Sequence, residues 1–264
     1  MRRPNLAAPI VWLVALAGVA PAASSADWTP LYVIPTESQL AVSPPPGAPL
    51  RLRLQVAETA RLAGRLGVEP PAAGSDLVVE TVVGVQPRMP EVAGRTWLES
   101  TFVIDHDDPH VVALRDEFRR EHPGAPTVGS IVAFVARRMQ PADDQGFEFA
   151  SEAATVLRGD CTEHAVLTAA LARSLGLPAR VALGIAVIRK PDESFGAYGH
   201  AWALVLDDGR WVIADAALAR EDVQPRYLPL GSMQDEGPGF MLDLLEPMTN
   251  WVQRVVVVGS VDPR

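Results

Sequence analysis

Apolar and polar residues alternate along several short segments of the first half of the chain, which is the pattern of half-buried strands. Three segments rich in valine, leucine, threonine or aromatic residues fit it: 50–56, 76–85 and 97–104. Residues 59–66 fit either a continued strand or a short helix. The proline-rich segment 27–50 predicts an extended arm rather than a packed element. The pattern therefore predicts a Pro-rich arm and a small β-rich lobe over residues 27–104.

Helical spacing dominates the middle of the chain. Asp108-Pro109 is a typical helix start, and residues 111–120 continue as an amphipathic helix. The pattern of residues 127–139 predicts a second helix, whereas the pattern of residues 147–157 does not distinguish a helix from other secondary structure. The strongest pattern is 161–175, where leucines recur every turn with alanines between them and Gly176 and Pro178 follow as stop signals. The alanines favour close packing of this helix against a sheet.

Antiparallel strands follow the long helix, at residues 179–189, 199–206 and 210–215. Asp208-Gly209 between the last two is a strong hairpin signal and would pair Asp207 with Arg210. Since side chains alternate between the faces of a strand, this register puts His200, Trp202 and Asp215 on one face, with His200 and Asp215 as diagonal neighbours. A Gly/Pro-rich loop near 231–239 and a last strand at 252–258 complete the prediction, so the fold class is α+β.

Cys161 is the only cysteine, and it stands at the predicted start of the long helix. Asp160 is a preferred N-cap residue, and Glu163 three positions later makes a capping box with it. Cys161 then occupies the first helical position, where the positive end of the helix dipole lowers the pKa of a thiol. A lone cysteine is also commonly a small buried apolar residue, so the downstream residues have to decide its role.

A thiol at a helix start and a His–Asp pair on neighbouring strands form the arrangement of nucleophilic cysteine catalysis. In this hypothesis Cys161 is the nucleophile, His200 accepts its proton, and Asp215 orients the imidazole. The Cys161 backbone N–H would help to bind the oxyanion. Trp202 either lines the substrate cleft or fills core. His164 either tunes the thiolate or packs and caps locally.

Charge and composition limit which binding partners and which cellular compartment we expect. The 264 residues carry a formal charge of −9, which disfavours nucleic acid and anionic membranes as partners. Residues 1–26 have the basic start, short apolar run and small-residue end of a cleaved signal peptide, with a retained anchor as the alternative. The expected location is therefore periplasmic or secreted, with no membrane contact beyond export. A single cysteine in an oxidising compartment has no partner within the chain, which favours a chemical role for it.

Four motifs within residues 105–220 resemble the core of the bacterial transglutaminase-like superfamily. They are GDCTEH at 159–164, ARSLGLPAR at 172–180, GHAW at 199–202 and WxxxD at 211–215. The resemblance implies a papain-like core, a cysteine helix packed on an antiparallel sheet, over a catalytic domain at 105–264. It implies Cys161, His200 and Asp215 as the triad and a protein or peptide substrate attacked through a thioester. One departure is Ala216-Ala217, where the family often has proline or alanine and then threonine.

Two alternatives to the enzyme hypothesis remain open. A non-catalytic binding or scaffold module could retain the same core. A metal site could use Cys161, His164 and His200, since zinc prefers such ligands. The acidic and histidine-rich segment 105–110 also suggests metal ligands, although helix capping by Asp108 explains it better. No cofactor and no metal are expected for the triad chemistry.

Overall fold

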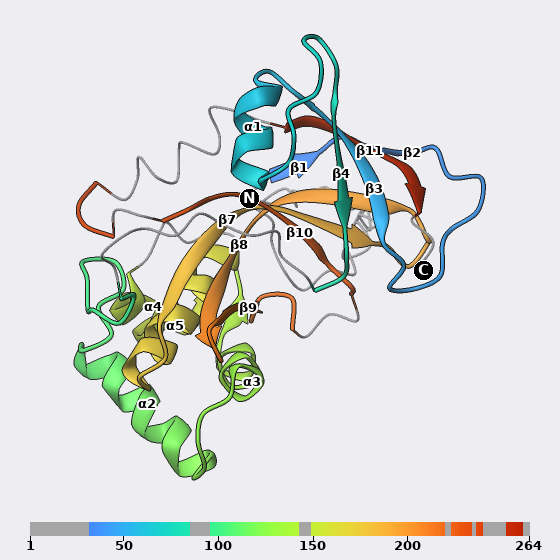
Figure 1. Cartoon of the computed structure of the whole chain (residues 1–264). Coiled ribbons are helices and arrows are strands. Elements are labelled where there is room, and N and C mark those ends of the chain that lie inside the picture. Colours follow the sequence, from blue (N-terminus) through green and yellow to red (C-terminus); the bar gives the residue numbers. More distant parts are fainter. Residues whose placement is uncertain are drawn as a thin grey trace, which may run out of the picture.

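The structure, a computed structural model, confirms an α+β fold built around a curled antiparallel sheet (Figure 1). It describes residues 32–84, 96–142, 149–219, 223–233, 236–239 and 252–260. The predicted signal peptide, residues 1–26, lies outside this part of the chain. Within it, no helix is long and apolar enough to cross a membrane.

The main sheet has five strands, in the order β1-β8-β7-β10 with β9 also paired to β8. Their bounds are β1 Tyr32–Ile34, β7 Ala179–Arg189, β8 Phe195–Asp207, β9 Arg210–Ala214 and β10 Arg226–Ser232. The β8–β9 hairpin pairs Asp207 with Arg210 and Leu204 with Ile213. This is the register that the Asp-Gly turn predicts, and Gly209 has the positive φ of 72° that such a turn needs.

A second sheet, in the order β2-β11-β3-β4, is built from both ends of the described chain. Its elements are β2 Thr36–Ser38, β3 Leu50–Val56, β4 Leu77–Thr81 and β11 Val252–Ser260, with helix α1 Thr59–Leu66 beside them. A small third pair joins β5 Gln140–Pro141 to β6 Arg158–Gly159. The prediction of an unpacked arm over 27–50 is wrong for residues 32–38, because β1 and β2 are paired there. The predicted last strand exists, but it belongs to the second sheet, so the sheets cross the predicted division at residue 104.

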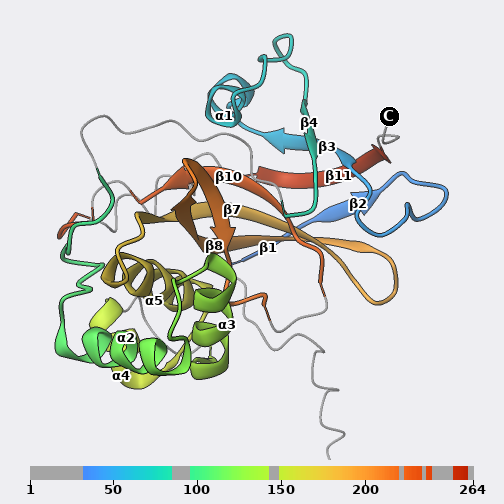
Figure 2. The ribbon, with the colours of Figure 1, turned by 60° about the horizontal axis from the view of Figure 1, so that its bottom comes forward.

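Four helices form a layer below the main sheet (Figure 2). They are α2 Pro109–Glu121, α3 Val128–Arg138, α4 Ala150–Val156 and α5 Cys161–Ser174. The Asp108 carboxylate accepts a hydrogen bond from the His110 N–H at 2.8 Å, which confirms the capping explanation of that acidic segment. Every residue of α5 from Cys161 to Arg173 is buried, as its alanine-rich sequence suggested.

The helices and the second sheet divide one face of the main sheet between them. Along β7, Val181 and Leu183 pack with the helices, whereas Ile185 and Val187, on the same face by alternation, pack with the second sheet. The opposite face carries a separate cluster around Trp202, Leu204 and Tyr227. The chemistry-bearing residues predicted on β8 and after β9 lie on that opposite face.

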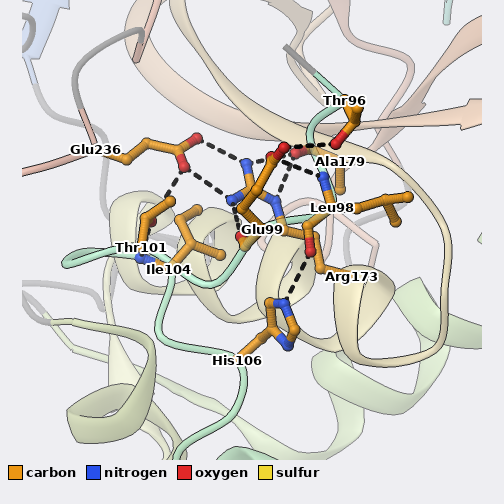
Figure 3. Close-up of polar contacts among 9 residues, drawn as sticks. All are labelled: Thr96, Leu98, Glu99, Thr101, Ile104, His106, Arg173, Ala179 and Glu236. Atoms are coloured by element: carbon orange, nitrogen blue, oxygen red, sulfur yellow. Dashed lines mark hydrogen bonds and ion pairs between the residues drawn. The ribbon is translucent and has the colours of Figure 1, made fainter.

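A buried cation fixes the C-terminal end of α5 (Figure 3). Arg173 donates to both carboxylate oxygens of Glu236 at 2.7 and 2.8 Å, and neither side chain of this pair is exposed. It also donates to the carbonyl oxygens of Ala179 and Glu99. Such a fork uses more donors than a lysine has. Arg173 therefore ties α5 to the start of β7 and to the segment before α2.

That segment, residues 97–104, is not the strand that its composition predicted. Trp97 has a φ of 58°, which a strand cannot contain. Its carbonyl accepts from the Ala179 N–H at 2.9 Å, and the Val103 N–H donates to the Glu236 carbonyl at 3.0 Å. These contacts with β7 and Glu236 provide hydrogen bonds for the backbone N–H and C=O groups of the segment, in place of those of a β-sheet.

Candidate active site

The first turn of α5 has the cap that the sequence predicted. The Thr162 N–H donates to the Asp160 carboxylate at 2.6 Å, and the Asp160 N–H donates to the Glu163 carboxylate at 2.8 Å. Cys161 is consequently the first residue of the helix, and it is 1% exposed. A side chain on Gly159 would overlap Glu163, so the approach to this cap requires glycine.

A gap in the sheet edge receives the cysteine. On one edge of β8, β1 pairs with residues 197–199 and β9 pairs with residues 203–207. No described strand pairs with residues 200–202 on that edge. The backbone N–H of Ala201, in the middle of the gap, hydrogen-bonds the Cys161 sulfur. The nucleophile predicted from the sequence thus lies against the backbone next to His200.

The His–Asp pair forms as the hairpin register predicted. His200 Nε2 lies 2.7 Å from Asp215 Oδ2, and both side chains are buried. Because an ionised carboxylate only accepts hydrogen bonds, Nε2 carries the proton, and Nδ1 is the basic nitrogen of the ring. This tautomer leaves the basic lone pair on Nδ1, as a general base requires.

Asp215 is held by two further donors. The Tyr227 hydroxyl donates to Oδ2 at 2.8 Å, and the Leu218 N–H donates to Oδ1 at 3.1 Å. Burial acts to raise the pKa of Asp215, but the charge and hydrogen bond of His200, together with these two donors, lower it below its usual value. Asp215 is therefore an anion over the whole neutral range.

Tyr227 is a site residue that sequence reasoning missed. It lies on β10, which contains Pro229 and Gly231 and was not recognised as a strand. Proline is tolerated there because β10 is the last strand of the main sheet, and the register shifts between Pro229 and Gly231. A tyrosine near the start of this irregular strand was the only available signal.

Trp202 is completely buried in this structure. Its ring lies 6.0 Å from the His200 ring at 24° and 4.9 Å from the Tyr227 ring at 52°. These contacts are those of the core-filling alternative. A role for Trp202 in substrate binding stays a prediction.

His164 makes a local contact within the first turn of its own helix. Its Nδ1 lies 2.7 Å from the Asp160 carbonyl oxygen, and the side chain is buried. Among the described residues, no group of three histidine, cysteine, aspartate or glutamate side chains is arranged to hold a metal ion. This contact and the burial agree with the prediction of a local role for His164, as packing rather than as a cap.

The Cys161 thiol is neutral in this environment. Burial and the charge of Asp160 raise its pKa well above the usual value, with smaller contributions from Asp215 and Glu163, while the Ala201 N–H acts in the opposite direction. The expectation that the helix start lowers this pKa is wrong here, because burial beside three carboxyl groups outweighs the dipole. The site holds a thiol and not a preformed thiolate.

Asp215 and Tyr227 also border a cleft of about 490 Å³. Most of its walls are apolar and come from α3, β9 and the segment after Asp215; they include Val128, Val132, Val212, Ile213, Leu218 and Val223. Cys161 and His200 do not line it. The cleft therefore reaches the Asp215 end of the site and not the sulfur.

Comparison with known proteins agrees with the fold. Residues 114–216 match the family model described as the transglutaminase-like superfamily. No curated protein matches the chain.

Several solved structures are similar over part of the chain. A proposed cysteine protease from Cytophaga hutchinsonii has 18% identity and a TM-score of 0.40, covering 59% of this chain and 55% of that one. The periplasmic domain of TgpA from Pseudomonas aeruginosa has 23% identity and a TM-score of 0.31, covering 41% and 44%. A structure described as a TGase has 22% identity and a TM-score of 0.30, covering 43% and 31%. Each match spans little more than half of the other chain, or less.

Proposed function

Because residues 114–216 match the family model of the transglutaminase-like superfamily, we propose that this protein is a cysteine-dependent acyl-transfer enzyme acting on amide bonds of proteins or peptides. The observation that carries the proposal is the buried His200–Asp215 pair at 2.7 Å, one residue from the N–H that holds the Cys161 sulfur. The signal-like residues 1–26 extend the proposal to an exported protein that works in the periplasm or outside the cell.

The reaction follows from the protonation states. Cys161 Sγ attacks the amide carbonyl through the gap in the β8 edge while His200 Nδ1 takes the thiol proton. Asp215 supports the resulting imidazolium, and the Cys161 N–H at the helix start stabilises the oxyanion. The imidazolium then protonates the leaving amine, the C–N bond breaks, and a thioester remains. Water completes hydrolysis, or a primary amine completes transamidation; His200 removes its proton in either case.

The neutral thiol adds a condition to this mechanism. Since Cys161 is almost fully buried and its pKa is raised, attack requires that substrate binding opens the site and that proton transfer accompanies attack. We expect slow alkylation of the resting protein by iodoacetamide compared with a free thiol, because the reactive form is the thiolate.

The test measures Cys161 alkylation by intact mass against pH, in the parent and in His200→Gln. If His200 is the base, its loss should slow alkylation about tenfold or more near neutral pH, within the range of general-base effects. The matched control is His110→Gln, since His110 is exposed at the start of α2. An alkylation profile that is the same with and without His200 would contradict the assignment.

A second measurement identifies the acyl acceptor. The protein is incubated with glutamine-containing peptides and an excess of a primary amine, and products are separated by mass. Amine addition indicates transamidation, and peptide cleavage or glutamine deamidation indicates hydrolysis. Cys161→Ala should abolish every product and leave the thermal unfolding transition in place.

A non-catalytic binding module remains the second candidate, and the burial of Cys161, which is 1% exposed, is the observation that favours it. In that case peptides would bind the parent and Cys161→Ala equally, and no thioester would be trapped by hydroxylamine.

A further inference from the structure

We propose that Tyr227 is a positioning residue of the site, whose hydroxyl holds the Asp215 carboxylate in register with His200. The inference rests on the proposed function for its effect on turnover, but its structural part does not. Tyr227 Oη and His200 Nε2 share one oxygen, Asp215 Oδ2, at 2.8 and 2.7 Å. With the Leu218 N–H on Oδ1, both carboxylate oxygens are fixed.

The sheet has room for this contact because β7 carries small residues on the relevant face. Ala182 pairs with Trp202 and Gly184 pairs with His200, whereas Tyr227 on the neighbouring β10 pairs with Ala186. Paired residues project to the same face. The tyrosine can therefore extend from β10 across β7 toward Asp215, at the far side of β8. A side chain on Gly184 would overlap the Leu228 carbonyl oxygen.

Aromatic packing fixes the phenol in place. The Tyr227 ring lies 4.9 Å from Trp202 and 6.4 Å from the His200 ring at 28°. Burial and the Asp215 charge raise the pKa of Tyr227, so its hydroxyl keeps its proton and donates at neutral pH. A buried donor to a carboxylate has a stronger effect than a neutral hydrogen bond.

The consequence concerns the imidazole. In Tyr227→Phe, the Asp215 charge is neutralised less, and it attracts a proton on His200 more strongly. His200 should then become protonated at higher pH than in the parent. If Tyr227 only filled space, Tyr227→Phe would not change the protonation of His200, because phenylalanine keeps the ring and removes only the hydroxyl.

The experiment follows the ring ¹⁵N signals of His200 against pH in the full chain, with the signals assigned by their loss in His200→Gln. We expect the His200 titration to move to higher pH in Tyr227→Phe. Tyr198→Phe is the matched control, since it removes a hydroxyl that lies beside Gly196 on β8; it should match the parent. Identical titration in the parent and Tyr227→Phe would overturn the proposal.

The second test measures turnover of the parent and of Tyr227→Phe. Tyr227→Phe should lower kcat about tenfold with little change in KM, as expected for a lost hydrogen bond to a charged group, and should move the acidic limb of the pH profile upward. A lower kcat with an unmoved limb and unmoved His200 signals would show a packing role and overturn the proposal. If the parent has no turnover at all, the proposed function fails, and the His200 titration still decides the role of Tyr227.

Discussion

At the scale of single residues, the site is a nucleophile surrounded by acids. Glu163 is 1% exposed, and burial, together with the charge and hydrogen bonding of Asp160, raises its pKa to about 8. It is consequently protonated at neutral pH while it accepts the Asp160 N–H. When it ionises, its charge adds to those that hold a proton on Cys161. The residue that caps the helix therefore also influences the sulfur.

Glu163→Gln should preserve the cap and remove this charge, because the amide oxygen can still accept the Asp160 N–H. We expect Cys161 alkylation to be faster in the variant above pH 8, where Glu163 of the parent is ionised, and nearly unchanged at pH 6. Glu152→Gln is the control, since Glu152 accepts the Phe149 N–H at α4 in the same way but is solvent-exposed. Equal alkylation rates in the variant and the parent at pH 9 would contradict the coupling.

The same substitution has a definite effect on stability. The folded protein keeps a proton on Glu163 that the unfolded chain loses above the ordinary pKa of 4.5. This contribution to the free energy of unfolding is complete below pH 4.5 and is lost as the pH rises to about 8. Relative to Glu163→Gln, the parent should lose stability across this interval, which urea unfolding at several pH values would measure.

The sequence predicted the positions of these residues better than their electrostatics. The cap, the helix start and the His200–Asp215 pair all depend on local rules of spacing and alternation. The raised pKa of Cys161 depends on how much of α5 is covered and on which carboxylates lie nearby. Those are tertiary quantities, and no local pattern contains them.

At the scale of elements, the site depends on which strands flank β8. The hairpin with β9 was predictable, because the Asp-Gly turn fixes its register. The contribution of β1 was not, because a short strand in a proline-rich segment has no periodicity of its own. β10 was not predicted either, because Pro229 interrupts the pattern that is typical of a strand. Yet β1 limits the gap at residues 200–202 from one side, and β10 supplies Tyr227.

Gly199→Ala tests the role of β1 directly. A Cβ at position 199 would overlap the ring of Tyr32, which pairs with Gly199 immediately before His200. We expect a loss of about 1–3 kcal/mol in the free energy of unfolding, as for other overpacked positions. Proposed turnover should fall as well, because the strand beside the base is displaced.

Gly64→Ala is the matched control, since Gly64 lies in α1 with no atom near its missing Cβ. Alanine should leave the protein unchanged or slightly more stable there, because it favours helix by about 1 kcal/mol. Replacing Tyr32 by alanine in Gly199→Ala should recover part of the lost stability. No recovery would show that the ring is not the source of the clash.

At the scale of the whole molecule, the family match covers only part of the chain that builds the main sheet. Residues 114–216 contain α3, α4, α5 and β7 to β9, but neither β1 nor β10. The second sheet takes β2, β3 and β4 from the start of the described chain and β11 from its end, with β11 parallel to β2 and antiparallel to β3. The two sheets are therefore joined through chain connections as well as through packing.

The interface between the sheets is apolar and extensive. It buries the main-sheet residues Ile185, Val187, Phe195, Ala197, Leu228 and Leu230 against the leucines and valines of the second sheet. Their burial contributes roughly 25 cal/mol per Å² of apolar area removed from water. An isolated main sheet would expose all six side chains.

This arrangement predicts that the fragment 105–264 does not fold alone, although it contains Cys161, His200 and Asp215. The fragment lacks β1, so the β8 edge beside His200 is open, and it lacks the partners of β11 and of the six apolar side chains. Its thermal melt should show no cooperative transition, whereas the chain from residue 27 onward should unfold in one step. Adding residues 27–104 as a separate polypeptide should restore the transition, because both lobes then complete their sheets. A cooperative transition of 105–264 alone, at the temperature of the longer chain, would show that the second sheet is an independent lobe with no part in holding the site.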